Sequence, residues 1–210
     1  MKTPEDIAAV LLAAGRSRRM GAFKPLLPFG GSSVVEACVA NLRAACVREV
    51  VVVVGHRAEE VRAALDGLSF VRFALNDEPG SEMGVSVARG VEAVPAGAGG
   101  LLVALCDQPA VPPAAVRSLI EARARTGARL VVPEWGGRGG HPVLVDLALR
   151  EELLSLVALK GLRALFDARR EEVLRVPVES PFVARDMDTW EEYVALHLEV
   201  FGFPPPARGR

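Results

Sequence analysis

Continuous apolar runs of strand length recur along the chain, and the residues between them carry a helical pattern. Because neither face of such a run is polar, each run predicts a strand that is buried on both faces of a sheet. The runs occupy residues 7–13, 50–54, 71–75, 101–106, 130–132, 142–145 and 173–178. The helical stretches occupy residues 33–45, 58–65, 85–94, 113–125, 147–154, 161–168 and 189–200.

The alternation of strand with helix predicts an α/β fold in which helices wrap both faces of a mostly parallel sheet. In open sheets of this kind, ligands bind beyond the carboxyl ends of the strands. The loops after Ala13, Val54, Leu75 and Cys106 are therefore where we expect the chemistry to lie.

The length of the chain, 210 residues and 22.3 kDa, fits one large domain. We expect this domain to span residues 1–202. Residues 203–210 read FPPPARGR and carry neither a helical nor a strand pattern. They are expected to form a disordered tail.

Charge and cysteine content narrow the range of functions. The 25 basic and 26 acidic residues leave a net charge of −1, so the chain has no global field to attract nucleic acid or an anionic membrane. Its longest apolar run, residues 7–14, is less than half of the roughly 18 residues that a membrane span needs. The 3 cysteines show no CxxC spacing and encode neither a disulfide framework nor a zinc site. These features predict a reduced, cytoplasmic protein.

A basic loop, residues 15–24, follows the first predicted strand. It contains Arg16, Arg18, Arg19 and Lys24 and no acid. In a chain that is neutral overall, this clustering predicts a site for an anion such as a polyphosphate. A solvated basic loop without a ligand has the same composition, and composition does not separate the two. The loop lacks GxGxxG and GxxxxGK[ST] spacing, which disfavours hydride transfer and ordinary ATPase chemistry.

Carboxylates are the second chemical signal. Asp107 directly follows the fourth strand, and Asp186 and Asp188 flank Met187 far downstream. In an extended segment, alternation aims both of these aspartates to one side. One of them could join Asp107 around Mg²⁺, which prefers carboxylate, water and phosphate oxygens. Asp188 could equally be the N-cap of the last helix, and the local sequence leaves both roles open.

Five segments, in the same order along the chain, resemble the MobA-like nucleotidyltransferases and, among these, the molybdenum cofactor cytidylyltransferase branch. The resemblance covers nearly the whole chain. The segments are LAAGRSRRMGAFKPLLPFGG (12–31), VVVVGHRAEEV (51–61), CDQPAVPP (106–113), GHPVLV (140–145) and DMDTWEEY (186–193).

The resemblance implies a Rossmann-like three-layer α/β/α nucleotidyltransferase fold with a mostly parallel mixed sheet. It also implies dependence on Mg²⁺ and transfer of CMP from CTP to the terminal phosphate of Mo-molybdopterin, with release of pyrophosphate. The product of such an enzyme serves a molybdenum hydroxylase, so the apo-enzyme of a hydroxylase is an implied partner.

Site residues follow from the same resemblance, position by position. The segment of Leu12, Ala13, Ala14 and Gly15 resembles the family's loop that holds the nucleotide base and phosphates. Arg19 and Lys24 resemble the catalytic clamps on the triphosphate, and Asn76 resembles a nucleotide contact. Asp107 resembles the principal Mg²⁺ ligand, which also contacts the nucleotide, and Asp188 a second metal-site carboxylate. Ser86 and His141 resemble residues on the acceptor side.

Three positions bear on the choice of substrates. Ala14 stands where relatives that use guanine nucleotides tend to have glycine, which favours CTP. Glu82 replaces a glycine common in relatives, and Leu159 stands where an acid is common. Both departures fall in regions expected to face the acceptor. The sequence therefore indicates the identity of the acceptor less clearly than that of the nucleotide. A sugar- or polyol-phosphate nucleotidyltransferase and a non-catalytic molybdenum cofactor carrier are the alternatives.

Other candidate residues have plain structural readings. His56 is expected in a loop that leads into a helix, and His197 on the surface of the last helix. Cys106 is expected as a small buried strand residue rather than a nucleophile, because no partner base is identifiable.

Overall fold

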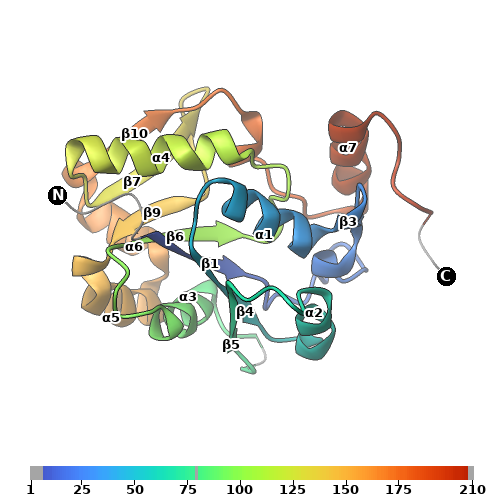
Figure 1. The fold of residues 1–210 in the computed structure, drawn as a ribbon, viewed down its shortest axis with the longest axis horizontal. Coiled ribbons are helices and arrows are strands. Elements are labelled where there is room, and N and C mark those ends of the chain that lie inside the picture. Colours follow the sequence, from blue (N-terminus) through green and yellow to red (C-terminus); the bar gives the residue numbers. More distant parts are fainter. Residues whose placement is uncertain (1–6, 79, 208–210) are drawn as a thin grey trace.

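A computed structural model describes residues 7–78 and 80–207. Side chains are described for all of these residues except 156–160. Its main sheet has 8 strands in the order β10-β7-β9-β6-β1-β4-β5, with β8 paired to β7 (Figure 1). The pairing of β9 with β6 and β7 is antiparallel, and so is that of β8 with β7, whereas the other pairs are parallel. The strands are β1 (Ile7–Leu12), β4 (Glu49–Val54), β5 (Val71–Leu75), β6 (Gly100–Leu105), β7 (Leu130–Trp135), β8 (Arg138–Gly139), β9 (Val143–Asp146) and β10 (Val173–Pro177).

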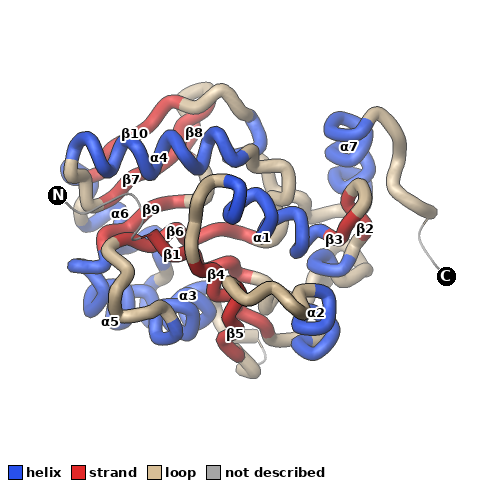
Figure 2. Tube along the Cα trace, in the orientation of Figure 1, coloured by secondary structure: helices blue, strands red, loops and turns tan. Residues whose placement is uncertain are grey.

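Helices cover both faces of this sheet. On one face α1 and α4 pack against the strands, and on the other α3, α5 and α6 do so (Figures 1 and 2). The α-helices are α1 (Val34–Ala44), α2 (Ala58–Ala64), α3 (Met83–Ala93), α4 (Pro113–Thr126), α5 (Arg150–Lys160), α6 (Leu162–Ala168) and α7 (Trp190–Phe201). Four 3₁₀ segments among the described residues are η2 (Lys24–Leu26), η3 (Leu147–Leu149), η4 (Arg170–Glu172) and η5 (Pro181–Ala184).

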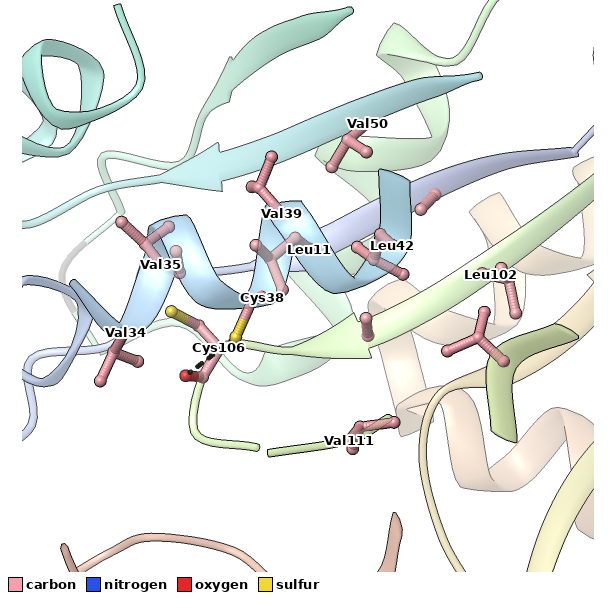
Figure 3. Packing of buried hydrophobic residues seen from close by; sticks show 14 of the residues in the cluster. Leu11, Val34, Val35, Cys38, Val39, Leu42, Val50, Leu102, Cys106 and Val111 are labelled. Carbon is pink, nitrogen blue, oxygen red and sulfur yellow. Dashed lines mark hydrogen bonds between the residues drawn. The ribbon is translucent and has the colours of Figure 1, made fainter. Parts of the chain in front are cut away.

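The alternation of side chains along β1 creates two hydrophobic cores. Leu11 points into a core with Val35 and Val39 of α1 (Figure 3), whereas Val10 points into a second core with Val87 of α3. This is the arrangement that a continuously apolar strand requires, because both of its faces are covered. The predicted mostly parallel, Rossmann-like α/β/α fold is therefore confirmed.

Three details differ from the sequence-based prediction. A short hairpin of β2 (Pro28–Phe29) and β3 (Ser32–Ser33) and the two-residue strand β8 have no counterpart in it, because an apolar run of strand length is absent there. The helix expected from position 147 divides into η3 and α5. All seven predicted strands are present, with end shifts of at most three residues and none for β5.

The C-terminal helix corrects one further expectation. His197 is not on the surface: it is 1% exposed, and its ring accepts a hydrogen bond from the backbone N–H of Gly30 and donates one to the carbonyl of Phe203. Phe203 in turn packs beside the rings of His197 and Phe201. The disordered tail expected over residues 203–210 stays a prediction, and residues 208–210 lie outside the described part of the chain. The error about His197 arises because α7 is covered by the β2–β3 hairpin, an element that the apolar pattern does not reveal (Figure 2).

The carboxyl ends of the central strands meet at one edge of the sheet. Here the ladder continues past the strands: the N–H of Ala13 donates to Val53, that of Cys106 to Leu12, and that of Asn76 to Val54. The loops that follow β6, β1, β4 and β5 consequently begin along one edge of the sheet. Within the part of the chain that the structure describes, no helix is long and apolar enough to span a membrane.

Candidate functional site

A cavity of about 570 Å³ opens at this edge of the sheet. Loops from four parallel strands form its wall, as ligand sites in open α/β sheets do. A second space of about 100 Å³ adjoins it and shares part of its lining. Of the predicted site residues, the large cavity is lined by Leu12, Ala14, Gly15, Asn76, Ser86 and Asp107, and the small one adds Ala13 and Lys24.

The basic loop is folded back on itself. Ser17 has a positive φ of 50°, and its hydroxyl accepts a hydrogen bond from the backbone N–H of Lys24 at 3.0 Å. Met20 and Phe23 are buried and anchor the loop in the core, whereas Arg16 and Arg18 line the cavity. The loop is thus held by apolar anchors while its cations face the space where a ligand would bind.

Two cations of this loop reach the predicted carboxylates. Lys24 Nζ lies 2.7 Å from Asp188 Oδ1 and 3.4 Å from Asp107 Oδ2. Arg19 Nη2 lies 2.7 Å from the other oxygen of Asp188. Residues from three distant parts of the chain therefore form one charged cluster beside the cavity. We call these four residues the charge cluster.

The two carboxylates of the charge cluster differ in their environment. Burial raises the pKa of Asp107, and the nearby charges of Asp186 and Asp188 add to this, although Lys24 opposes it. For Asp188 burial also raises the pKa, but the hydrogen bond and charge of Lys24 together with Arg19 outweigh it, so the pKa is lowered. Asp188 is thus stabilised as an anion, whereas Asp107 is held in a setting that disfavours its own charge.

The residues that flank the Asp186–Asp188 segment, Arg185 and Thr189, have extended backbone angles. Met187 is 1% exposed and points inward, and its N–H donates to the carbonyl of Asp107 at 3.1 Å. Thr189, not Asp188, is the N-cap of α7: its hydroxyl accepts from the N–H of Glu192, whose carboxylate accepts from the N–H groups of Asp188 and Thr189. The capping role considered for the Asp188 side chain is wrong, and its carboxylate is left for the charge cluster.

Asn76 is committed to the wall of the cavity. Its amide nitrogen donates to Ser86 Oγ at 2.7 Å and to Ser81 Oγ at 3.0 Å, and its side-chain oxygen accepts from the N–H of Glu78 at 3.3 Å. Asn76 is 6% exposed and Ser86 is 8% exposed. This network ties the loop after β5 to the first turn of α3. Gly55 is required beside it, because a Cβ there would lie 2.6 Å from the carbonyl oxygen of Asn76.

Ser86 and His141, both expected on the acceptor side, lie in different surroundings. Ser86 lines the large cavity. The backbone N–H of His141 donates to the carbonyl of Val183 at 2.8 Å, and Gly140 allows this approach because a Cβ there would lie 1.9 Å from the same oxygen. Burial lowers the pKa of His141, and the charge of Asp186 opposes this shift. His141 therefore faces the acidic segment rather than the wall around Ser86.

Gln108 is a buried neighbour of the charge cluster whose pairing the sequence did not reveal. It is 6% exposed, its amide nitrogen donates to Asp186 Oδ1 at 2.8 Å, and its side-chain oxygen has no hydrogen-bond partner among the described residues. The one indication in the sequence that Gln108 lies near the site was its position directly after Asp107. Because its partner lies 78 positions downstream, local sequence could not predict the pairing.

The charge cluster fits a divalent cation that a ligand helps to hold. Asp107 Oδ1 is buried without a hydrogen-bond partner in the described part of the chain. The described residues contain no group of three or more His, Cys, Asp or Glu side chains that could hold a metal ion by themselves. Mg²⁺ commonly binds through one or two carboxylates together with phosphate and water oxygens. Asp107 and Asp188 suit that mode and do not suit a closed protein cage.

An open α/β sheet with basic and acidic side chains gathered at its carboxyl edge defines a protein that binds an anionic ligand, such as a nucleotide, at the strand ends. Residues 9–173 match the model of the MobA-like NTP transferase domain, and the chain belongs to this family.

Curated relatives carry several functional names. The chain is 31% identical over 199 residues to nicotine blue oxidoreductase of Paenarthrobacter nicotinovorans, covering 90% of this chain and 96% of the relative. It is 35% identical over 148 residues to molybdenum cofactor guanylyltransferase of Nitrobacter hamburgensis, covering 69% of each. It is 36% identical over 129 residues, 60% of this chain, to bifunctional protein GlmU of Geobacter metallireducens, of which it spans only 27%.

Solved structures agree over nearly the whole chain. A Mycobacterium sp. strain JC1 homologue of Mycobacterium tuberculosis Rv0371c superposes with a TM-score of 0.81 and 31% identity, covering 93% of this chain and 97% of that one. Rv0371c itself, in a complex with manganese, superposes with a TM-score of 0.76 and 31% identity, covering 94% of this chain and 100% of that one.

Proposed function

We propose that the protein transfers CMP from CTP to the terminal phosphate of Mo-molybdopterin and releases pyrophosphate. The observation that carries this proposal is the charge cluster, which sets two cations and two carboxylates beside a cavity of about 570 Å³. A site for a neutral ligand has no use for this many charges, whereas a triphosphate with a divalent cation uses both signs.

The proposed chemistry needs positioning and charge rather than a strong base. An acceptor phosphate is already anionic at neutral pH, so no general base has to activate it. Arg19 and Lys24 would orient the triphosphate and stabilise the charge that develops around the α-phosphorus and on the departing pyrophosphate. Asp107 and Asp188 would hold Mg²⁺, which supplies further charge neutralisation at the phosphates when bound.

The relatives support parts of this proposal. One is named a molybdenum cofactor guanylyltransferase, and one solved structure is described as a complex with manganese. For the present chain Mo-molybdopterin as acceptor and Mg²⁺ as cation are proposals. A molybdenum hydroxylase apo-enzyme as recipient and the cytoplasm as location stay predictions from sequence.

The choice of CTP over GTP rests on Ala14. Its side chain lines the large cavity, and its Cβ lies close to Gly55, 3.1 Å from where a Cβ on that residue would be. A methyl group at this point takes space that a purine ring would need and a pyrimidine would not.

The similarity to nicotine blue oxidoreductase favours oxidoreduction as a second candidate function, because the match covers 90% of the present chain. An oxidoreductase acting on a conjugated ring would need a carrier of electrons, such as a nicotinamide or flavin cofactor. The loop after β1 lacks the dinucleotide spacing, and two carboxylates held by cations serve no evident purpose in hydride transfer. Nucleotidyl transfer therefore remains the better-supported function.

One experiment separates the nucleotidyltransferase candidates from one another and from a non-catalytic carrier. The purified protein is incubated with Mg²⁺, Mo-molybdopterin and, in separate reactions, CTP, GTP, ATP or UTP, and both pyrophosphate and the dinucleotide product are measured. We expect product with CTP. Product only with GTP would overturn the nucleotide assignment. Pyrophosphate release only when a sugar phosphate replaces the pterin would overturn the acceptor. No release with any nucleotide, together with tight binding of Mo-molybdopterin, would favour the non-catalytic carrier.

A further inference from the structure

Three of the four carboxylate oxygens in the charge cluster are already paired with side-chain cations. Lys24 contacts Asp188 Oδ1 and Asp107 Oδ2, and Arg19 contacts Asp188 Oδ2. The fourth oxygen, Asp107 Oδ1, is buried and has no hydrogen-bond partner among the described residues. A divalent cation that binds this pair of carboxylates has to take lone pairs that the ammonium and the guanidinium now use.

Lys24 and a divalent cation are poorly compatible at such short range. The lysine side chain is only 12% exposed, so water screens its charge weakly. Two positive charges a few ångströms apart in this environment repel each other, and the carboxylates cannot serve both fully. Any increase in cation occupancy must therefore weaken the contacts of Lys24, and the reverse also holds.

The side chain of Lys24 has room for a second position. Its backbone is fixed by the bond to the Ser17 hydroxyl and by Pro25, which follows it in η2. Its side chain lines the small cavity, which shares Leu12, Gly15, Ser17 and Asp107 with the large one. Rotation about the flexible four-carbon stem can carry the ammonium toward a triphosphate while the loop stays in place.

We propose that Lys24 and the divalent cation exclude each other at Asp107 and Asp188, so that the cation binds tightly only after the triphosphate has drawn Lys24 away. This inference rests on the proposed function for the identity of the triphosphate. It assigns Lys24 a role in the order of binding, in addition to its clamp on the phosphates. Binding of nucleotide and cation then has positive coupling, and each ligand raises the affinity for the other.

The test measures Mn²⁺ binding by electron paramagnetic resonance in the absence of any nucleotide. Lys24→Met removes the ammonium and keeps the length of the stem, and Lys24→Gln removes the charge but keeps a donor. Both should bind Mn²⁺ at least about tenfold more tightly than the wild type, because a nearby like charge is lost. Arg19→Met should show a smaller increase, because it frees only one oxygen of Asp188.

Arg18→Met is the matched control, since it removes a positive charge from the same loop at a residue that lines the cavity. It should change Mn²⁺ affinity by no more than about twofold, as expected for an exposed and screened charge. Equal gains in Arg18→Met and Lys24→Met would mean that net charge, rather than competition at the carboxylates, is responsible, and would overturn the proposal.

A second titration uses α,β-methylene-CTP in EDTA, so that no divalent cation is present. Lys24→Met should bind this analogue more weakly than the wild type, although it binds Mn²⁺ more strongly. A purely structural role of Lys24 would weaken both. Unchanged or weaker Mn²⁺ binding in both Lys24 variants overturns the competition.

Asp107→Asn separates this failure from failure of the proposed function. If Asp107→Asn abolishes Mn²⁺ binding while the Lys24 variants gain nothing, the cation site stands and only the competition is wrong. If Asp107→Asn binds Mn²⁺ as the wild type does, the cation lies elsewhere and the metal assignment in the proposed function fails with it.

Discussion

The backbone N–H of Met187 donates a hydrogen bond to the carbonyl oxygen of Asp107 at 3.1 Å. This bond joins the loop after β6 to the extended segment before α7. Because Met187 is buried, the neighbouring aspartates are turned toward the opposite side, where Asp188 meets Lys24 and Asp186 meets Gln108. The position of the second carboxylate is therefore set by backbone pairing and an apolar anchor.

Lys24→Ala should lower turnover by at least about 100-fold, the scale seen when one preorganised charge-stabilising group is lost. The protein should stay folded, because the lysine contributes to the charge cluster rather than to the core. Turnover at saturating CTP and acceptor, with thermal unfolding measured in parallel, checks this. Arg125→Ala, at an exposed residue near the end of α4 that lines neither cavity, is the control and should retain most activity. A folded Lys24→Ala protein with near-wild-type turnover would contradict the assignment of the basic loop to the triphosphate.

Thr189→Ala should lower the free energy of unfolding by about 0.5–2 kcal/mol, the usual loss when a helix N-cap is removed. Thr189 is the residue whose hydroxyl accepts from the first turn of α7. Thr189→Ser keeps that hydroxyl and should lose little. Chemical denaturation of both variants gives the comparison. If the two variants are equally stable, the capping bond has no energetic weight and the separation of roles between Thr189 and Asp188 loses its support.

The sequence predicted this site in part, and the reasons differ between residues. Asp107 was found because it ends a continuous apolar run, and strand ends in parallel sheets share one edge. For Asp188 the local pattern serves a cap and a ligand equally well, and only the observed bonds of Thr189 and Glu192 remove the capping role. Local sequence does not show which neighbouring side chain accepts the hydrogen bond of a given backbone N–H.

The sequence could not predict which residues are buried by segments that are distant along the chain. His197 looks like a surface residue of an amphipathic helix, yet the β2–β3 hairpin covers it and Gly30 donates to its ring. The hairpin has two-residue strands, which are too short to give an apolar signal. The prediction failed where a small element covers a helix face, and it succeeded where one long apolar strand fixes its own two-sided burial.

Asn76→Ala should destabilise the protein by about 1–3 kcal/mol, because Ser86 and the N–H of Glu78 lose their partner. The loop between β5 and α3 would then be held less firmly, so KM for the nucleotide should rise more than kcat falls. Steady-state kinetics and thermal unfolding test both effects. Ser81→Ala is the milder control, since it removes one of the two hydroxyls that Asn76 contacts. A large loss of kcat with unchanged stability would instead indicate direct contact of Asn76 with the reacting groups.

Asp107→Asn and Asp188→Asn should change stability in opposite directions in metal-free buffer at pH 7. The raised pKa of Asp107 means that its ionisation disfavours the folded state above that pKa, so asparagine should raise Tm. The lowered pKa of Asp188 means that its charge stabilises the folded state above the unfolded pKa, and this stability is lost as pH falls through the folded pKa, so asparagine should lower Tm at pH 7. A change of about 1 kcal/mol shifts Tm by about 2–4 °C in a chain of this size.

Both differences should shrink as pH falls to the region where the carboxyl groups are protonated in the folded state. Thermal unfolding of the three proteins from pH 7 down to the acid limit of solubility measures this. Two variants with Tm changes of the same sign would show that the two carboxylates do not have the opposed environments described above. Differences that persist unchanged at low pH would assign them to packing rather than to charge.

Ala14→Gly should relax the preference for CTP over GTP without inverting it. Ala14 lines the cavity beside Gly55. Under the proposed function its methyl group takes space that a purine ring would need, so its removal should give room for a purine. One methyl group in a pocket is worth about 1–3 kcal/mol of discrimination, or roughly 10- to 200-fold in kcat/KM. Measuring kcat/KM for both nucleotides on wild type and variant gives the ratio directly. A wild type that already prefers GTP would show that the nucleotide assignment is wrong, whereas an unchanged ratio in Ala14→Gly would show that the preference has another cause.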